Sequence, residues 1–370
     1  TLDRTLDRVA HFTTDEDVTV VQSRRGHVTG FDNATGRKLW VRQLGRNGDV
    51  SFPATSNADI VVIPTGSNIY GIQKLTGNMA WEVPVPGAPS VSAVTDSKHV
   101  YVGTVSGTVY AFDLAKLSRF YKEALLPRWS KLTQAWVYQT GSSITTPAVT
   151  TGLVVNFAAR DGQLYGLSAE ERKLRFQFET DAPIAAPMAY SGSKLYLASE
   201  DFNVYCLNAD NGVIQWEFVS GLPIRKQAQV VGNHVYLLPD GGGMYALADS
   251  DGQELWLNPK ANEFLAATSS LVYASDSSGN VLILGREDGA TLGMIPLRDF
   301  DVRVSNDRTD RVYLTTSTGL TVCLRELNRP FPIYHKYPDR QPVLPEVTPE
   351  GAPPAADDAA APAQNDAPQP

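Results

Sequence analysis

A slot that holds a small residue recurs about every forty positions along most of this chain, usually directly after a tyrosine. Its occupants are Gly30, Gly71, Ala111, Gly166, Cys206, Ala246, Ile283 and Cys323, separated by steps of 41, 40, 55, 40, 40, 37 and 40 residues. A repeat of this length is typical of radial and solenoid architectures, in which each unit buries its apolar surface only against its neighbours. This periodicity constrains the fold more than any single motif does.

Two further positions keep the phase of the slot. Glycine often stands six residues after it and tryptophan ten residues after it, and Trp136 keeps this register once an insertion of 15 residues is removed. Such a glycine supplies the positive φ of a turn, and a buried tryptophan can donate its indole N–H to the backbone of the neighbouring unit. The small residue is expected on a middle strand, close to that neighbour. We therefore assign structural roles to Trp40, Trp81, Trp136, Trp216, Trp256, Gly36, Gly77, Gly212 and Gly252.

Each unit contains four short runs rich in β-branched and aromatic residues, and turn residues separate these runs. In the fifth unit the runs are 187–190, 194–198, 203–207 and 213–218. Such runs are typical of strands, and four strands in about forty residues make one propeller blade. Eight units fit the chain, with residues 8–12 as the first strand of the first blade and 331–335 as the last strand of the eighth.

The sequence therefore predicts an all-β, eight-bladed β-propeller of four-stranded blades over residues 1–341. The alternative is a ring of seven blades with a shared closing blade. It remains open because Gly293 and Ile333 stand where the last two units would carry tryptophan.

Several stretches carry a family pattern. They are Gly30-Phe-Asp-Asn-Ala-Thr-Gly-Arg-Lys-Leu-Trp40, Gly107-Thr-Val-Tyr-Ala-Phe-Asp113 and Met244-Tyr-Ala-Leu247 followed by Gly252-Gln-Glu-Leu-Trp256. They resemble the PQQ-like repeat of quinoprotein-type β-propellers, and the resemblance covers residues 7–335. It implies either a quinone-dependent dehydrogenase or a non-catalytic scaffold, since the family holds both. One such scaffold is the propeller lipoprotein of the outer-membrane β-barrel assembly machinery.

The residues favour the scaffold over the enzyme. Dehydrogenases of this family typically add an adjacent cysteine pair, a stacking tryptophan in the channel, calcium ligands and a catalytic aspartate. This chain has only Cys206 and Cys323, which predict two separate buried thiols, and five of its six tryptophans belong to the repeat. The acidic stretch 249–254 coincides with the repeat turn rather than with a complete calcium loop. We expect no catalytic, cofactor or metal residues, and a PQQ-dependent oxidoreductase or small-ligand binder using the channel is the alternative.

Charge and hydropathy limit the kinds of partner that this chain is expected to bind. The net charge is −8 and no basic stripe exists, so nucleic acid is not expected as a partner. No apolar run approaches the roughly 18 residues of a membrane span. The chain begins with Thr1 rather than Met, which leaves room for an upstream signal peptide or lipid anchor. With the resemblance, this predicts a periplasmic or other extracytoplasmic, envelope-associated scaffold that binds protein partners.

The insertion at 114–135 interrupts the repeat. Apolar residues fall on one helical face, and five Lys or Arg against one acid give a local net charge of +4. A basic amphipathic element on an acidic protein is a plausible docking surface, with Phe120, Tyr121, Arg128 and Trp129 as the expected contact residues. The alternative is that the element folds over its own blade and buries these apolar residues.

The last segment, 342–370, differs in composition from the rest. It holds eight prolines and many alanines, with five acidic residues and no Lys or Arg. Too little apolar surface is present to support a core. This composition predicts a disordered acidic tail or spacer.

Overall fold

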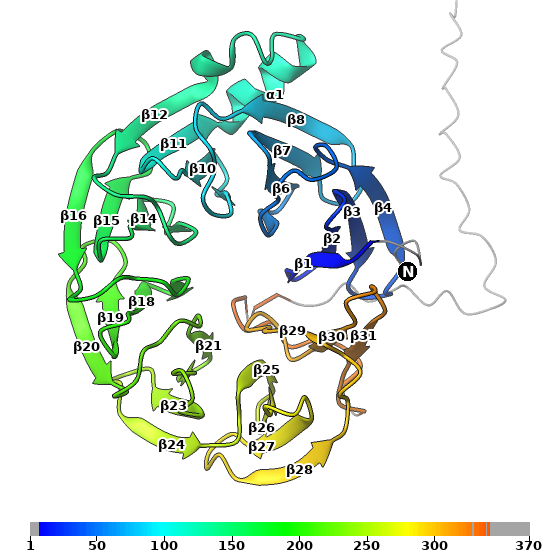
Figure 1. Ribbon diagram of the computed structural model, residues 1–370, viewed down its shortest axis with the longest axis vertical. Coiled ribbons are helices and arrows are strands. Elements are labelled where there is room, and N and C mark those ends of the chain that lie inside the picture. Colours follow the sequence, from blue (N-terminus) through cyan, green and yellow to red (C-terminus); the bar gives the residue numbers. More distant parts are fainter. Residues whose placement is uncertain (1–6, 328, 338, 341–370) are drawn as a thin grey trace, which may run out of the picture.

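The computed structural model describes residues 7–327, 329–337, 339 and 340 (Figure 1). The predicted tail at 342–370 lies outside the described residues, as do residues 1–6. Eight antiparallel sheets surround a common centre in Figure 1, seven of four strands and one of three. The eight-bladed propeller is thus confirmed, and the seven-bladed alternative is excluded.

The strands of the first four blades are β1 (Val9–Thr14), β2 (Val18–Ser23), β3 (His27–Asp32), β4 (Lys38–Gln43), β5 (Thr55–Ser56), β6 (Ile60–Thr65), β7 (Asn68–Gln73), β8 (Met79–Pro84), β9 (Val94–Thr95), β10 (His99–Gly103), β11 (Thr108–Asp113), β12 (Gln134–Gln139), β13 (Val149–Thr150), β14 (Val154–Ala158), β15 (Gln163–Ser168) and β16 (Leu174–Glu179). The helix α1 (Leu114–Lys122) and the 3-10 helix η1 (Ser130–Thr133) lie between β11 and β12.

The remaining blades contain β17 (Ala189–Ser191), β18 (Lys194–Ala198), β19 (Asn203–Asn208), β20 (Ile214–Val219), β21 (Gln229–Val231), β22 (His234–Leu237), β23 (Met244–Ala248), β24 (Glu254–Asn258), β25 (Glu263–Ala267), β26 (Leu271–Ser275), β27 (Val281–Gly285), β28 (Thr291–Ile295), β29 (Val302–Val304), β30 (Val312–Thr315) and β31 (Thr321–Leu324). In each blade the first strand lies nearest the centre and the last strand lies on the rim (Figure 1).

Strand direction defines two ends of the ring. Because neighbouring strands in a blade are antiparallel, the turn after the first strand and the turn after the third strand lie at the same end. In blade one these are the turns at 15–17 and 33–37. We call this end of the ring the Asp15 face. The insertion follows β11, the third strand of blade three, and therefore begins on the Asp15 face.

The repeated tryptophan is held between two glycines. Gly30 pairs with Trp40 across β3 and β4, and a Cβ added to Gly30 would lie 2.3 Å from Trp40. On the other side, a Cβ on Gly77 of the next blade would lie 2.4 Å from Trp40. The slot is therefore small because the tryptophan of its own blade covers it, not because of the neighbouring blade as expected. The turn glycine provides both the positive φ of its turn and the close approach to the tryptophan of the preceding blade.

The indole also connects the blades. Nε1 of Trp40 donates to the carbonyl of Lys74, three residues after the next slot, at 2.8 Å. Trp136, Trp216 and Trp256 donate to Ala169, Asp249 and Arg286 in the same way, at 3.0, 2.9 and 2.8 Å. Phe176 occupies this position in blade four and has no donor, and Nδ2 of Asn156 donates to the matching carbonyl of Ala209 at 3.0 Å instead.

Trp81 is the exception, and the insertion explains it. Its matching acceptor would be the carbonyl of Leu114, which is the first residue of α1. Carbonyls in a helix accept the bonds of the helix itself. Within the described residues, Nε1 of Trp81 has no hydrogen-bond partner. The indole is fully buried and packs in a cluster that includes Leu117 of α1.

Blade eight departs from the prediction. Residues 331–335 do not add a fourth strand to β31; Tyr334 forms only an isolated bridge with Thr309. Pro330 and Pro332 have no backbone N–H, and a strand paired along β31 would lack those donors. The outer edge of β31 is unpaired within the described residues. Cys323 on β31 is consequently exposed, whereas Cys206 is buried and the two thiols are free, so only one of the two predicted buried thiols is buried.

Candidate functional site

The insertion is anchored at its start. The carboxylate of Asp113 accepts a hydrogen bond from the backbone N–H of Lys116 at 2.9 Å and caps α1. Asp, Asn, Ser and Thr are favoured at this position because they satisfy an unpaired amide of the first turn. Leu117 and Phe120 are buried, and the helix packs on β8 and β11. This part of the insertion has the packing role that was the alternative to docking.

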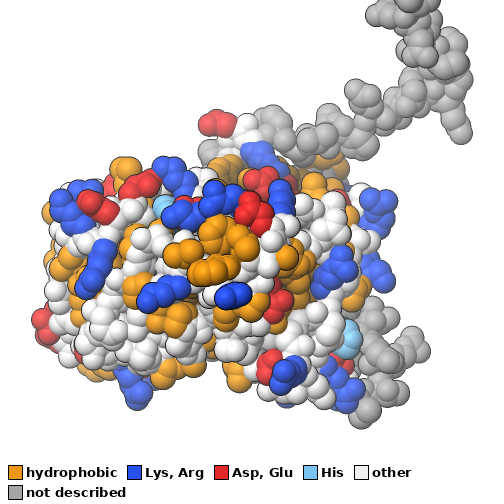
Figure 2. Space-filling model, turned by 90° about the horizontal axis from the view of Figure 1, so that it is seen from above, with side chains coloured by type: hydrophobic (Ala, Val, Ile, Leu, Met, Phe, Trp, Pro, Cys, Tyr) orange, Lys and Arg blue, Asp and Glu red, His pale blue; other side chains and the backbone are white. Residues whose placement is uncertain are grey.

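The opposite side of the insertion faces solvent. Tyr121 and Trp129 are 38% and 44% exposed, and Leu132 is also exposed. The guanidinium of Arg128 lies 5.3 Å from the centre of the Trp129 ring, a cation–π contact. Figure 2 views the molecule from the side on which α1 lies in Figure 1, and apolar side chains form a patch there with cations on several sides. We call this set the insertion surface: Tyr121, Trp129 and Leu132 with Arg119, Lys122, Arg128 and Lys131.

Of the four predicted contact residues, three are on the surface and one is buried. Tyr121, Arg128 and Trp129 lie on the insertion surface, whereas Phe120 is only 8% exposed. Phe120 points inward because the helical face that carries Leu117 is the one that packs on the blade. Leu132 belongs to the surface but was absent from the predicted set. It lies in η1, which the helical periodicity of 114–125 did not reach.

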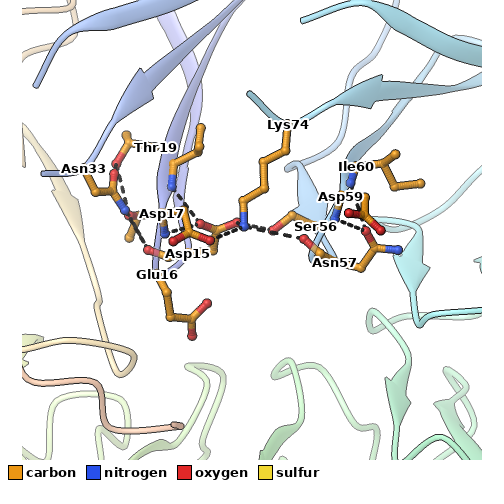
Figure 3. Close-up of polar contacts among 12 residues, drawn as sticks. Asp15, Glu16, Asp17, Thr19, Asn33, Ser56, Asn57, Asp59, Ile60 and Lys74 are labelled. Carbon is orange, nitrogen blue, oxygen red and sulfur yellow. Dashed lines mark hydrogen bonds and ion pairs between the residues drawn. The ribbon is translucent and has the colours of Figure 1, made fainter. Parts of the chain in front are cut away.

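A second group of charged side chains lies between blades one and two (Figure 3). Nζ of Lys74 lies 2.8 Å from the carboxylate of Asp15 and 3.0 Å from that of Asp17. Asp15 also accepts hydrogen bonds from the backbone N–H groups of Asp17 and Val18, both at 2.8 Å, and from the hydroxyl of Ser56. The side chain of Lys74 is only 5% exposed. We call these residues the Lys74 cluster.

The charges in this cluster stabilise one another. Burial by itself would raise the pKa of Asp15, but the Lys74 ammonium and the hydrogen bonds hold that pKa below its ordinary value. Burial would likewise lower the pKa of Lys74, but Asp15 and Asp17 raise it above its ordinary value. Both groups therefore stay charged at neutral pH. A buried pair of this kind contributes geometry and blade-to-blade contact rather than a titrating group.

The end of the described chain crosses the centre of the ring. Residues 329–337, 339 and 340, which we call the strap, lie beside β29 near the centre in Figure 1. His335 donates to the carbonyl of Ala267 at 2.9 Å. Lys336 pairs with Asp307 at 2.8 Å and donates to the carbonyl of Tyr190 at 3.1 Å. Arg340 pairs with Asp17. The strap thus connects blades eight, seven, five and one on the Asp15 face.

Sequence reasoning missed both the Lys74 cluster and the strap. A signal for the first was available, because Lys74 stands three residues after the slot, where blades six and seven also carry polar residues that contact the preceding blade. Asp249 pairs there with Lys194 at 2.9 Å, and Arg286 donates to the carbonyl of Val231 at 2.7 Å. No comparable signal marks the strap, whose contacts depend on residues far away in the sequence.

Two further findings concern metals and membranes. Among the described residues, no three His, Cys, Asp or Glu side chains are grouped so as to hold a metal ion. The turn at 249–252 has its first carboxylate paired with Lys194 and hydrogen-bonded to the hydroxyl of Tyr196. Across the part of the chain that the structure covers, no helix has the length and apolar character to cross a membrane.

The geometry defines a class: an eight-bladed propeller with tryptophan-linked blades and one helical insertion. The sequence model of the family described as outer membrane protein assembly factor BamB matches residues 5–171 and 160–328. The chain belongs to this PQQ-like family. No curated protein sequence matches it.

The solved structures that are similar in fold include the following two. BamB from Moraxella catarrhalis shares 18% identity at a TM-score of 0.67 and covers 89% of this chain and 99% of its own. The computationally designed Ika8 protein shares 14% identity at a TM-score of 0.66, with 87% and 98% covered. At these identities the similarity concerns the fold.

Proposed function

We propose that this protein is a non-catalytic scaffold that binds protein partners during outer-membrane protein assembly, outside the cytoplasm. Membership in the BamB family carries this proposal. The same membership supports a periplasmic, envelope-associated location, and the partners are components of the assembly machinery or their substrates.

The insertion surface is the docking site we assign to this function. Aromatic residues and arginine dominate binding hot spots because they bury a large area at a small entropic cost, and Tyr121, Trp129 and Arg128 are of this type. Its charge is opposite to that of the whole protein, which favours encounter with an acidic partner surface. Leu117 and Phe120 anchor the insertion to the blade, so the surface is held in place before a partner binds.

The charges near the ring centre support a scaffold over a quinone-dependent enzyme. Carboxylates do gather there, but Asp15 and Asp17 pair with Lys74, Glu16 pairs with Arg308 at 3.0 Å, and Asp307 pairs with Lys336. The ring of Tyr334 lies 5.1 Å from the guanidinium of Arg340. These groups already have partners, whereas a cofactor site would use free carboxylates and an uncovered aromatic ring.

The test changes the surface without touching the anchor. A variant with Y121S, R128E, W129S and L132S keeps Leu117 and Phe120, so it should fold with an unchanged thermal midpoint. Tagged full-length protein is purified from its native host, and co-purified assembly components are identified by mass spectrometry. We expect the variant to lose them.

A control separates this result from a general loss of surface hydrophobicity. Leu292 and Met294 are exposed on β28, far from the insertion in the ring. The variant L292S/M294S should retain the partners. If the insertion-surface variant retains the full set as well, the surface is not the docking site.

A further inference from the structure

We propose that the acidic C-terminal segment 341–370 of this chain docks on the insertion surface and covers it until a partner displaces it. This inference rests on the proposed docking role of that surface and adds its regulation. The occupant is therefore a segment of the protein itself.

The two elements have complementary charge. The insertion carries Lys116, Arg119, Lys122, Arg128 and Lys131 against Glu123, which is a net charge of +4. The segment 341–370 carries Glu346, Glu350, Asp357, Asp358 and Asp366 and no Lys or Arg, which is a net charge of −5. A second basic stretch, residues 24–46, holds six Lys or Arg against one acid, but its aromatic side chains Phe31 and Trp40 are not exposed, so it lacks the aromatic surface of the insertion.

Their side-chain chemistry matches as well. The segment contains eight prolines, and proline-rich chains bind surfaces lined by aromatic rings because little conformational entropy is lost. Tyr121 and Trp129 present such rings, with Leu132 beside them in the same insertion. Carboxylates between the prolines would reach the cations that surround the rings.

The strap sets where the segment begins. Arg340, the last described residue, pairs with Asp17 in the turn after β1, on the Asp15 face. The insertion follows β11 and begins on that same face, two blades away. Thirty residues span up to about 100 Å when extended and about 30 Å as a flexible coil. The segment therefore reaches the insertion without crossing the ring to the other face.

The contact is weak for each charge and depends on the covalent connection. Exposed ion pairs contribute only a few tenths of a kcal/mol each, but a tethered segment acts at an effective concentration in the millimolar range. Since the Debye length falls from about 10 Å at 0.1 M salt to about 3 Å at 1 M, the contact should be lost at high salt. A partner with a larger matching surface can displace it.

The tryptophans supply a direct readout. Trp129 is 44% exposed, whereas Trp40, Trp81, Trp136, Trp216 and Trp256 are each at most 6% exposed. Quenching of the full-length protein by acrylamide therefore reports almost entirely on Trp129. We compare the natural chain with a variant in which E346Q, E350Q, D357N, D358N and D366N remove the charge of the segment.

We expect the slope of acrylamide quenching to rise about twofold in the uncharged variant, because a millimolar effective concentration leaves a weak site about half covered. The natural chain in 1 M salt should show the same rise. W129F should abolish both differences. Equal quenching of the natural and uncharged chains in low salt overturns the proposal, as does a difference that persists in W129F.

Two outcomes distinguish the intrachain contact from a contact between two copies of the protein and from the proposed docking function. Protection of Trp129 that weakens on dilution of the protein would assign the cover to a second copy and overturn the intrachain contact. Equal quenching combined with loss of partners in the surface variant would retain the proposed function and reject only the tail contact.

Discussion

Blades five and eight both carry a cysteine in the small-residue slot, but the cysteine is buried in blade five and exposed in blade eight. Cys206 on β19 pairs with Trp216 of β20 and is fully buried. Cys323 on β31 pairs with Tyr313 of β30 on one side, has no strand on the other among the described residues, and is exposed. The identity of the slot residue thus does not decide its burial. The fourth strand decides it.

The closing mechanism differs in the same way. Four of the blade-to-blade contacts use an indole N–H and a carbonyl. The contact of blade eight with blade one uses the ion pair of Arg308 with Glu16, a backbone bond from Val9 to Ser317 at 2.9 Å, and the rings of Phe12 and Tyr313 at 5.8 Å. The contacts between most neighbouring blades therefore use residues that the repeat already supplies. The contact that closes the ring, between blades eight and one, uses residues that occur only there.

The largest effect should come from removing an indole. W216A should lower the free energy of unfolding by about 3–5 kcal/mol, because a large buried aromatic and its hydrogen bond are lost. W129A is the matched control and should stay within about 0.5 kcal/mol, because Trp129 is on the surface. Urea denaturation of both variants gives the comparison. A W216A variant as stable as W129A would contradict the register of blade five.

Removing the buried cation between blades one and two should have an effect of similar size. K74M should cost about 3–5 kcal/mol, because Asp15 is left buried without its partner. D15N added to K74M should recover part of the loss, and urea denaturation measures each variant. If D15N adds its own cost instead, the carboxylate is not what makes the loss of Lys74 expensive.

The contribution of Asp15 to stability should depend on pH in opposite ways in K74M and in the natural protein. The folded pKa of Asp15 is lowered, so the stability it contributes is present above about pH 4 and is lost as the pH falls through the folded pKa. Without Lys74, burial raises the pKa of Asp15, so acidification protonates it in the folded state and relieves the penalty. The stability difference between the two proteins should therefore shrink on lowering the pH from 7 to 4.

A pair of turn glycines compares the two kinds of blade contact directly. Gly252 has a φ of +73° and a Cβ there would lie 2.5 Å from Trp216, whereas Gly36 has a φ of +69° and no atom within 4 Å. G36A should cost about 1–2 kcal/mol for the left-handed backbone alone. G252A should cost about 1–3 kcal/mol more, because the methyl group also overpacks the indole. Equal costs in urea denaturation would show that the tryptophan sandwich is not tight.

The smallest effect concerns the two thiols. Burial raises the pKa of the Cys206 thiol to about 12 and also raises the pKa of the Cys323 thiol, but only Cys323 is exposed to a reagent in the folded protein. We expect a disulfide reagent to modify Cys323 in the native protein and Cys206 only after unfolding, with C206S and C323S identifying each thiol. Equal rates for the two would mean that the edge of blade eight is covered.

The sequence by itself determined the forty-residue repeat, the four-stranded plan of blades one to seven and the roles of the tryptophans and turn glycines. These features can be predicted because the same contacts recur about every forty residues, so the same residue types recur at that spacing in the sequence. The sequence favoured eight blades over seven, and the structure decided between them. For α1 the sequence predicted only part of the result. Helical spacing predicted an apolar face but not whether a blade or a partner covers that face. Leu117 and Phe120 are covered by the blade, and Tyr121 and Trp129 are not.

Only the tertiary structure decided how the ring closes and where the chain ends. Glu16 and Arg308 are 292 residues apart, and Asp17 and Arg340 are 323 residues apart. Each of these contacts occurs once, so no periodicity marks it, and the residues meet only because the ring brings its first and last blades together. For the same reason the residues at 331–335, strand-like in the sequence, cross the ring as part of the strap instead of completing blade eight.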